Sequence, residues 1–431
     1  MANDPKETLE ALVRLEPLSL QGQAPVVWDR AEGVRVWDTA GNEYLDFSSG
    51  VLVANVGHGR AEIVDAIVQT ATKPLLFTYS FPSDERAALL LELEPLLPRE
   101  DDKVMLLSTG AEAIECALKL VRTYALRTYG EKRSYIISFE RGFHGRTMGA
   151  QLAGGTPALK EWLYGIDAPF VNVPFPDGFR TADTSFESFL ATLEREDIAP
   201  HEVAGVIVES YQGGGASFAP AEYMQSLAMW CAEHDVKLIM DEVQSGFGRT
   251  GTWFAFEHYE ITPDLVVCGK GISSSMPLSA VIGKRELLDQ FAPGAMSSTH
   301  GGHPICCAAA RANLQVMRAE GVVDNAARVG EFVSAALTEF GERFPFIGAV
   351  HGKGLVYALH VVRPGTEHPD AEAAIRIVKD CVQNGLMLFA PVGYGGASVK
   401  VCPPLVITQD EAAAGLGILE QALEREESRS A

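Results

Sequence analysis

Residues 104–122 read VMLLSTGAEAIECALKLVR, and the fold can be derived outward from this stretch. Val104–Ser108 is a short apolar run of the kind that forms a buried strand. Beyond Thr109 the apolar residues recur at intervals of three, four and seven, which is the spacing of one helix face. They are Ile114, Ala117, Leu118, Val121 and Ala125. The stretch therefore predicts a buried strand that leads directly into a helix.

The same alternation of strand and helix patterns continues along the chain. Further short apolar runs lie at 135–138, 203–210, 236–241, 265–269 and 278–283. Helical spacing separates several of them, and a long helical segment follows from Pro304 to about Ala319. Alternation of this kind predicts an α/β fold around a mostly parallel sheet.

The chain has 431 residues, which is too long for one compact core, so we expect more than one packed unit. Residues 1–56 read as a short helix and strands with a hairpin turn at 40–42, and we expect them to pack with a small domain. Residues 57–320 form the predicted large domain, and 321–431 form a smaller α+β domain.

Composition and charge narrow the class of protein. The formal net charge of −22 argues against nucleic acid as a partner, because an acidic chain repels phosphate backbones. The seven scattered cysteines do not form a disulfide framework, and no apolar run reaches the ~20 residues that cross a bilayer. The first residues lack the pattern of a secretory leader. We therefore expect a cytoplasmic protein without a membrane partner.

The junction Ser108-Thr109-Gly110-Ala111-Glu112 is a candidate anion site. Backbone N–H groups at a helix start favour an anion, and a glycine there allows close approach. Taken alone, the same residues also fit a well-capped helix with Glu112 in its first turn.

Asp241 is an acid that ends an otherwise apolar strand. Ligands bind at such strand ends in α/β folds, so its carboxylate either caps a turn or holds a buried cationic partner. Nearby, Gly246, Gly248 and Gly251 have the spacing of a dinucleotide site. We reject that interpretation because no helix pattern follows them.

Lys270 lies between two glycines directly after a predicted buried strand. A lysine that is desolvated in a pocket has a lowered pKa and can form a Schiff base. A surface turn is the simpler interpretation of Lys270 alone.

Together the three stretches fit the needs of pyridoxal phosphate: an anion cradle, a lysine for its aldehyde, and an acid for its pyridine nitrogen. Phe143 and His144, just past the strand that ends at Phe139, offer an aromatic face for the ring.

With these residues the chain resembles the class III (ω-amino acid type) pyridoxal-phosphate aminotransferases of fold type I, the group of 4-aminobutyrate and ornithine aminotransferases. The resemblance runs from about Trp28 to the last helix. Its motifs are STGAEAIECALKLVR, FHGRT, DEVQSGFGRTG, CGKGI, STHGGHP and PPL, in the order of the family. It implies a mostly parallel seven-stranded sheet and a large domain that binds the cofactor.

The resemblance also implies roles for individual residues. Lys270 would form the Schiff base and move the proton, and Asp241 would pair with the pyridine nitrogen. The other implied cofactor contacts are Gln244 at the phenolic oxygen, Val243 and Phe143 on opposite ring faces, the amides of Gly110 and Ala111 at the phosphate, and Thr299 at the phosphate of the neighbouring subunit. A homodimer with shared active sites follows.

Small-molecule amine and oxo compounds are the expected substrates. Lys400 stands where the family often has an arginine that clamps a carboxylate, and lysine cannot make the bidentate fork. Glu209 matches a family glutamate, which we expect either to pair with Lys400 or to attract the amino groups of a substrate. A salt bridge between Glu209 and Lys400 that has no role in selectivity is an equally open interpretation. Val51 and Tyr79 complete the predicted substrate contacts. We therefore expect an amino acid or an amine as donor, and an acceptor that comes from an ω-amino acid, an amine or an oxidised amino sugar of the aminoglycoside type.

The sequence leaves two alternative functions and one metal site to consider. A racemase or epimerase of the same family would need a proton donor opposite Lys270, for which Cys402, expected on the strand face of Lys400, and Tyr79 are candidates. A regulator without turnover disagrees with the intact Lys270 and Asp241. A zinc site at 300–307 lacks a second spaced pair of ligands, so we expect no metal.

Overall fold

The computed structural model describes residues 4–73 and 75–430. The chain divides into two compact units. Ala61–Val323 is called the central unit here, and Met1–Arg60 together with Asp324–Ala431 is called the terminal unit. The assignment of a cofactor-binding role to the large domain stays a prediction.

The central unit is built on a seven-stranded sheet with the order β4-β10-β9-β8-β7-β5-β6. Its strands are β4 (Lys103–Leu107), β5 (Tyr135–Phe139), β6 (Phe170–Val173), β7 (Val203–Glu209), β8 (Lys237–Glu242), β9 (Leu265–Cys268) and β10 (Ser279–Gly283). Only β10 runs antiparallel to its neighbours. This confirms the predicted α/β fold with a mostly parallel sheet, because the apolar strand runs alternate with helices.

Helices and short 3-10 turns connect these strands. The α-helices are α3 (Ala61–Thr72), α4 (Asp84–Leu93), α5 (Gly110–Tyr129), α6 (Met148–Ala153), α7 (Glu187–Arg195), α8 (Ala221–Glu233), α9 (Arg285–Leu288) and α10 (Pro304–Ala319). The 3-10 helices are η2 (Glu94–Leu96), η3 (Pro157–Leu159), η4 (Glu161–Leu163), η5 (Pro200–Glu202), η6 (Ala255–Tyr259) and η7 (Lys270–Ile272).

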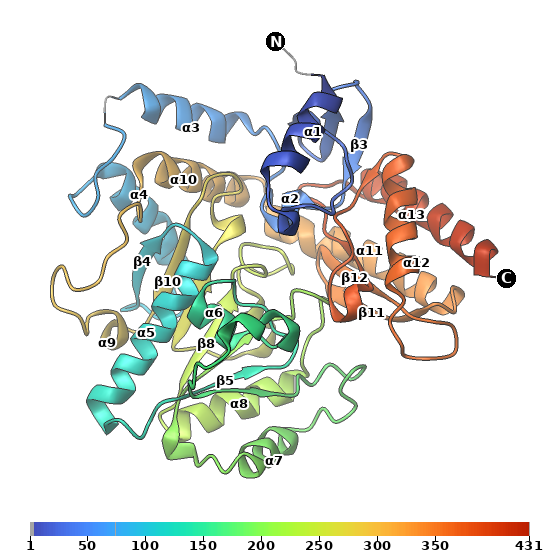
Figure 1. The fold of residues 1–431 in the computed structure, drawn as a ribbon. Helices are drawn as coiled ribbons and strands as arrows, with labels where there is room; N and C mark the ends of the chain where they lie inside the picture. Colours follow the sequence, from blue (N-terminus) through green and yellow to red (C-terminus); the bar gives the residue numbers. More distant parts are fainter. Residues whose placement is uncertain (1–3, 74, 431) are drawn as a thin grey trace. The chain divides into compact units, whose positions relative to one another are not determined.

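Helices cover both faces of the central sheet. The apolar face of α5 packs on β7, β8, β9 and β10, and Figure 1 shows this helix beside β4 and β10. Ile136 of β5 belongs to the core cluster under α5. Phe139 lies three positions further along the strand and therefore points to the opposite face, where it contacts Tyr223 of α8. The sheet is thus buried on both sides, as its continuous apolar strands predict.

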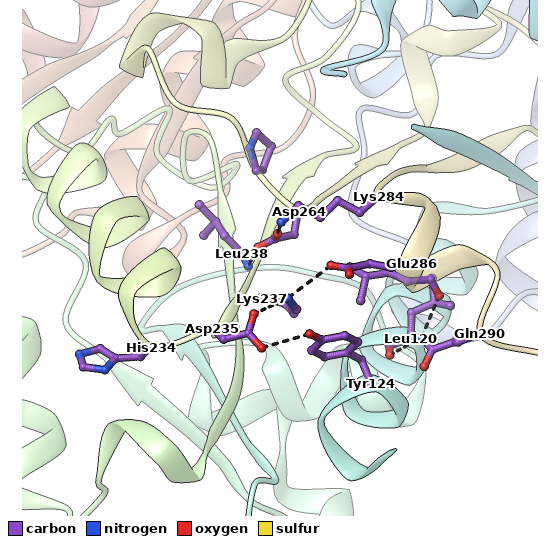
Figure 2. A network of polar contacts seen from close by, with 12 residues as sticks. Leu120, Tyr124, His234, Asp235, Lys237, Leu238, Asp264, Lys284, Glu286 and Gln290 are labelled. Atoms are coloured by element: carbon purple, nitrogen blue, oxygen red, sulfur yellow. Dashed lines mark hydrogen bonds and ion pairs between the residues drawn. The ribbon is translucent and has the colours of Figure 1, made fainter. Parts of the chain in front are cut away.

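A polar network closes the amino end of β8, at the edge opposite the carboxyl strand ends (Figure 2). The side chain of Lys237 is 3% exposed, and its ammonium lies 2.6 Å from Asp235 Oδ1 and 4.1 Å from the centre of the Tyr124 ring. Tyr124 also donates a hydrogen bond to Asp235, and Glu286 lies 3.7 Å from the ammonium. A buried charge is tolerated here because it is paired on several sides.

The terminal unit contains two smaller sheets, with the orders β1-β2-β3-β13 and β11-β12-β14. Its strands are β1 (Trp28–Glu32), β2 (Arg35–Asp38), β3 (Glu43–Asp46), β11 (Ile347–Lys353), β12 (Val356–Val361), β13 (Leu386–Met387) and β14 (Ser398–Val401). Its helices are α1 (Pro5–Leu15), η1 (Leu18–Leu20), α2 (Ser49–Leu52), α11 (Val322–Arg343, whose first residues belong to the central unit), α12 (Ala371–Gln383), η8 (Tyr394–Gly396) and α13 (Gln409–Ser430). The antiparallel pair β2–β3 encloses the predicted hairpin turn at 40–42. Among the described residues, no helix has both the length and the apolar character to span a membrane.

Candidate active site

The carboxyl ends of six strands share one edge of the central sheet. Strands β5 to β9 run parallel, and β4 points the same way because β10 is antiparallel to both β4 and β9. Most residues singled out from the sequence lie here: Gly110 and Ala111 after β4, Phe143 and His144 after β5, Glu209 at the end of β7, Asp241, Val243 and Gln244 at the end of β8, and Lys270 after β9. This edge is where open α/β sheets bind ligands.

Lys270 begins η7 with a backbone φ of +43°, a left-handed conformation that is uncommon for a residue with a side chain. Burial lowers the pKa of its ammonium group, and the negative charges of Asp241 and Glu209 offset only part of that effect. Among the described residues, none accepts a hydrogen bond from its Nζ. A desolvated amine without a fixed partner is suited to act as a nucleophile or a base.

Lys237 shows the contrasting case of a structural lysine. Burial acts to lower its pKa too, but the hydrogen bond to Asp235 and nearby negative charges outweigh this and raise the pKa (Figure 2). Its ammonium is held in place and stays charged. Of these two lysines, Lys270 therefore has the environment of a reactive amine.

Asp241 is fixed by two hydrogen bonds. Its Oδ1 accepts from the backbone N–H of Val243 at 3.0 Å, and its Oδ2 lies 2.7 Å from Nδ1 of the buried His144. Burial disfavours the charged imidazole, but the hydrogen bond and charge of Asp241 outweigh it and raise the pKa of His144. His144 thus orients the carboxylate, a relationship that no pattern in the sequence indicated.

The start of α5 offers two backbone donors. Thr109 caps the helix by accepting the N–H of Glu112 at 3.2 Å, and the Glu112 carboxylate turns back to accept the N–H of Ser108 at 2.8 Å. The N–H groups of Gly110 and Ala111 have no partner among the described residues. Two free donors at a helix start form an anion site.

Val243 lies against both glycines that flank the site. A Cβ on Gly110 would come 2.7 Å from Val243 Cγ1, and one on Gly269 would come 3.2 Å from the same atom. The helix start, the Val243 side chain and the segment before Lys270 are therefore in van der Waals contact. Glycine is needed at 110 because any side chain would displace Val243.

Two further predicted contacts present polar or aromatic groups. The Oε1 atom of Gln244 is buried and has no hydrogen-bond partner among the described residues. The ring of Phe143 is 42% exposed, and the guanidinium of Arg146 lies 5.5 Å from its centre. An unpaired buried amide is costly unless a ligand completes it.

Thr299 lies in an exposed turn of the central unit. Two contacts near this turn join it to the segment of Tyr79, whose hydroxyl lies 2.9 Å from Ser297 Oγ. The rings of Phe77 and His300 are 5.5 Å apart. Thr299 is thus carried on a loop that is tied to the predicted substrate contact Tyr79.

Val51 and Lys400 belong to the terminal unit. Val51 is exposed and has a φ of +64°. Lys400 lies on β14 opposite Ala358 of β12, with only 1% of its surface exposed. Their contribution to the site, and a pairing of Lys400 with Glu209 of the central unit, stay predictions.

Cys402 is also in the terminal unit, and its expected place on the strand face of Lys400 is wrong. Strand β14 ends at Val401, so Cys402 lies beyond it. Its backbone N–H donates to Phe47 at 2.8 Å and its carbonyl accepts from Ser49 Oγ at 2.6 Å. The strand ends because these bonds replace the sheet ladder.

Comparison with known proteins identifies the family. The family model "Aminotransferase class-III" matches residues 19–423. A probable 4-aminobutyrate aminotransferase from Bacillus subtilis is 34% identical over 411 residues, covering 91% of this chain and 92% of the relative. An alanine/serine racemase from Pyrococcus horikoshii is 32% identical, covering 93% of this chain and 86% of the relative. The crystal structure of an (S)-enantioselective omega-transaminase from Thermomicrobium roseum superposes with a TM-score of 0.90 at 29% identity, covering 99% of this chain and all of the other.

The chain belongs to the class III aminotransferases, which are pyridoxal-phosphate-dependent enzymes. The site's own groups fit that cofactor. Gly110 and Ala111 offer free donors for a phosphate, Gln244 has a buried amide oxygen left for a polar ligand group, and Asp241 is an oriented carboxylate for a ring nitrogen. The expected reaction class, transamination, is therefore confirmed.

Proposed function

We propose that Lys270 is the residue of this aminotransferase that joins the cofactor and moves the proton during the transfer. The observation that carries the proposal is the environment of Lys270, a half-buried residue whose amine has a lowered pKa and no hydrogen-bond acceptor among the described residues, near the Asp241 carboxylate. Pyridoxal phosphate, when bound, supplies an aldehyde for the amine and a ring that takes up electron density from the substrate carbon. The Nζ of Lys270, whose lowered pKa favours its unprotonated form, would take the proton from that carbon and deliver it to the former aldehyde carbon of the cofactor.

The other site residues bind and orient the cofactor in this proposal. Asp241, held by His144, would pair with the pyridine nitrogen and keep it protonated. The amides of Gly110 and Ala111 would bind the phosphate, and the Gln244 amide would meet the phenolic oxygen. Val243 and Phe143 would cover the ring.

A homodimer with shared active sites is part of the proposal. Thr299 would reach the phosphate bound by the neighbouring subunit, which requires it to lie on the surface of its own chain. The exposed apolar side chains near it on the adjoining segment support an interface there; they are Leu75, Leu76, Phe77 and Phe81. Light scattering of the purified protein tests the dimer. A cytoplasmic location stays a prediction, supported by the seven buried free cysteines.

The proposed substrates are an amino acid or amine donor and an aldehyde or ketone acceptor. The named relative that acts on 4-aminobutyrate supports an ω-amino acid. The buried Lys400, in place of a bidentate arginine, supports a substrate whose carboxylate is held less firmly or is absent, such as an amine or an oxidised amino sugar. Residues 57–320 are proposed as the cofactor-binding domain, with 1–56 and 321–431 forming the smaller one.

The first experiment is a visible absorption spectrum of the purified protein before and after L-glutamate or L-alanine. A yellow band that bleaches with the amino acid supports the proposal, and K270A is expected to lose the response. K237M is the matched control, because it removes a buried lysine outside the site. Equal bleaching in K270A and wild type would overturn the role of Lys270.

A racemase or epimerase is the second candidate, because one relative with 32% identity is named an alanine/serine racemase. Deuterium incorporation at the substrate carbon without loss of the amine would favour it. The candidate donors are Cys402 and Tyr79, and hydrogen bonding with Ser297 and Ser80 lowers the pKa of Tyr79. Loss of exchange in Y79F or C402S would identify the donor.

A further inference from the structure

The carboxylate of Glu209 joins two loops of the central unit. Glu209 is the last residue of β7 and only 7% exposed. Its Oε2 accepts the backbone N–H of Phe143 at 2.9 Å, and its Oε1 accepts the backbone N–H of Gly213 at 2.8 Å. Both oxygens are therefore engaged by main-chain donors of this unit.

Glycines allow both backbones to come this close to the carboxylate. A Cβ on Gly213 would lie 2.9 Å from Glu209 Oε1, and one on Gly142 would lie 3.7 Å from Oε2 and 2.9 Å from the carbonyl oxygen of Phe139. A side chain at Gly213 would push its loop away from the acid, and one at Gly142 would press against the Phe139 carbonyl and shift the backbone beside Phe143. The two loops and the acid therefore fit one another closely.

One loop carries a group that the proposed function assigns to the cofactor, and the other loop supports a second such group. The exposed ring of Phe143 depends on its backbone for its position, and that backbone is held by Glu209 and by the hydrogen bond from Gly155 to Gly142 at 2.8 Å. On the other side, a Cβ on Gly213 would lie 2.6 Å from Nε2 of Gln244. The Gly213 backbone therefore forms the surface against which the Gln244 amide rests.

We propose that Glu209 is a positioning residue, which holds Phe143 and the support of Gln244 at the spacing that the cofactor ring requires. The inference rests on the proposed function, and it differs from a role for Glu209 in contacting substrate amines. Glutamate suits this role because a carboxylate accepts two N–H groups at once, whereas an amide offers one acceptor and one donor.

The two hydrogen bonds that Glu209 accepts from Phe143 and Gly213 are called the Glu209 clamp. The charged groups around the Glu209 carboxylate make this clamp sensitive to pH. Burial raises the pKa of Glu209 to about 7, and the charge of Asp241 adds to this, whereas His144 and the two N–H donors oppose it. Lys270 is the other charged group of the central unit that interacts with it. Below pH 7 the carboxyl group takes up a proton and loses acceptor capacity, so the clamp weakens.

The test compares E209Q and E209D with wild type, with E115Q as the matched control. Glu115 accepts the N–H groups of Gly149 and Ala150 at 2.7 and 3.2 Å, at the start of α6, which follows the loop of Phe143. The measured quantities are the Kd for pyridoxal phosphate and the visible circular dichroism of the bound cofactor, which reports how the ring is held. The wild-type cofactor band tests the proposed function separately.

We expect E209Q and E209D each to weaken pyridoxal phosphate binding about tenfold, the equivalent of one hydrogen bond to a charged group, and to reduce the dichroism band. E115Q is expected to match wild type in both. Aspartate keeps the negative charge, but its side chain is too short to accept hydrogen bonds from both loops. E209D therefore distinguishes the effect of side-chain length from the effect of charge, and it replaces E209Q in the test if E209Q does not fold.

A double-mutant cycle shows whether Glu209 acts through Phe143. If it does, F143A reproduces the loss of dichroism, and E209Q adds less in the F143A background than in wild type. Wild-type affinity and dichroism in E209Q and E209D would overturn the proposal. A raised KM for the amine donor with an unchanged dichroism band would also overturn it, because that result indicates direct substrate contact.

Discussion

The Nδ1 atom of His144 lies 2.7 Å from Oδ2 of Asp241, with both side chains buried. Asp241 comes from a strand of the central sheet and His144 from the loop after another strand, so the pair links two parts of the edge where the cofactor is proposed to bind. This hydrogen bond holds the Asp241 carboxylate in one orientation.

Replacement of His144 tests how much this orientation matters. H144L removes the donor, and we expect kcat/KM to fall about ten- to a hundredfold, which corresponds to about 1.5–3 kcal/mol for a hydrogen bond to a charged group. H144N keeps an N–H at a similar place and is expected to lose less. Steady-state kinetics with the donor that bleaches the cofactor band give the comparison. Equal activity of H144L and wild type would remove His144 from the mechanism.

Asp241 also controls the titration of Lys270. Burial lowers the pKa of Lys270, and the charge of Asp241 acts in the opposite direction. D241N removes that charge, so we expect the pKa of Lys270 to fall further. The pH dependence of Lys270 acetylation in the cofactor-free protein, followed by mass spectrometry, measures the midpoint. A midpoint that moves to higher pH would contradict this assignment, and Lys237 in the same sample serves as the internal reference.

The contact between Gly110 and Val243 predicts a rescue experiment. In G110A the new Cβ would meet Val243 Cγ1 at 2.7 Å, far inside normal carbon contact, and we expect a loss of about 1–3 kcal/mol in the free energy of unfolding. V243A makes room for that Cβ, so G110A/V243A should be more stable than the two single effects added together. Urea unfolding of wild type, G110A, V243A and G110A/V243A gives the four free energies of unfolding that this double-mutant cycle needs. Strict additivity would show that the two side chains do not compete for space.

Lys237 is expected to matter for stability alone. K237M removes the ammonium that lies over the Tyr124 ring and leaves Asp235 without its cation, at a cost of about 2 kcal/mol in the free energy of unfolding. The spectrum of the bound cofactor should not change, because the network lies at the opposite edge of the sheet. A shifted cofactor band in K237M would mean that the two edges are coupled.

Glu209 predicts a pH dependence with a definite sign. Its pKa is raised by burial to about 7 in the folded protein, above its ordinary value of 4.5. Between pH 4.5 and about 7 the folded protein therefore keeps a proton on Glu209 that the unfolded chain has released. The contribution of Glu209 to the free energy of unfolding is most favourable below pH 4.5, and it is lost as the pH rises to about 7. The loss amounts to about 3 kcal/mol at about 1.4 kcal/mol per pKa unit.

Glutamine at 209 has no proton to lose in that range. The free energy of unfolding of cofactor-free E209Q should therefore fall less steeply than that of wild type between about pH 4.5 and 7. Urea titrations of both proteins across this range supply the measurement. Parallel profiles would show that Glu209 has an ordinary pKa.

Much of the central fold is visible in the sequence because buried parallel strands are continuous apolar runs. The exception is β6 (Phe170–Val173), which the pattern did not reveal. Asn172 interrupts its apolar residues, and its side chain is satisfied only in the fold, by Ser138 at 2.8 Å and Lys160 at 2.8 Å. A short strand whose polar residue finds distant partners carries no local signal.

The candidate site also contains residues that the sequence indicates and relationships that only the fold reveals. Gly110, Asp241 and Lys270 could be singled out because each combines an unusual residue with a strand end. The bond between His144 and Asp241 could not, because the two residues are 97 positions apart and only the folding of the sheet brings them together. The double clamp of Glu209 was hidden for the same reason, since its partners are backbone groups of any residue type.

The antiparallel strand β10 has a consequence for the order in which the enzyme is made. Within the sheet β4 is paired with β10 alone, although β4 leaves the ribosome long before it. At about 5–20 residues per second, β4 and the helix start behind it wait on the order of ten to thirty seconds for their partner strand. During synthesis the end of the sheet proposed to bind the phosphate is therefore completed last, and the nascent chain must keep an unpaired apolar strand from aggregating until β10 has emerged.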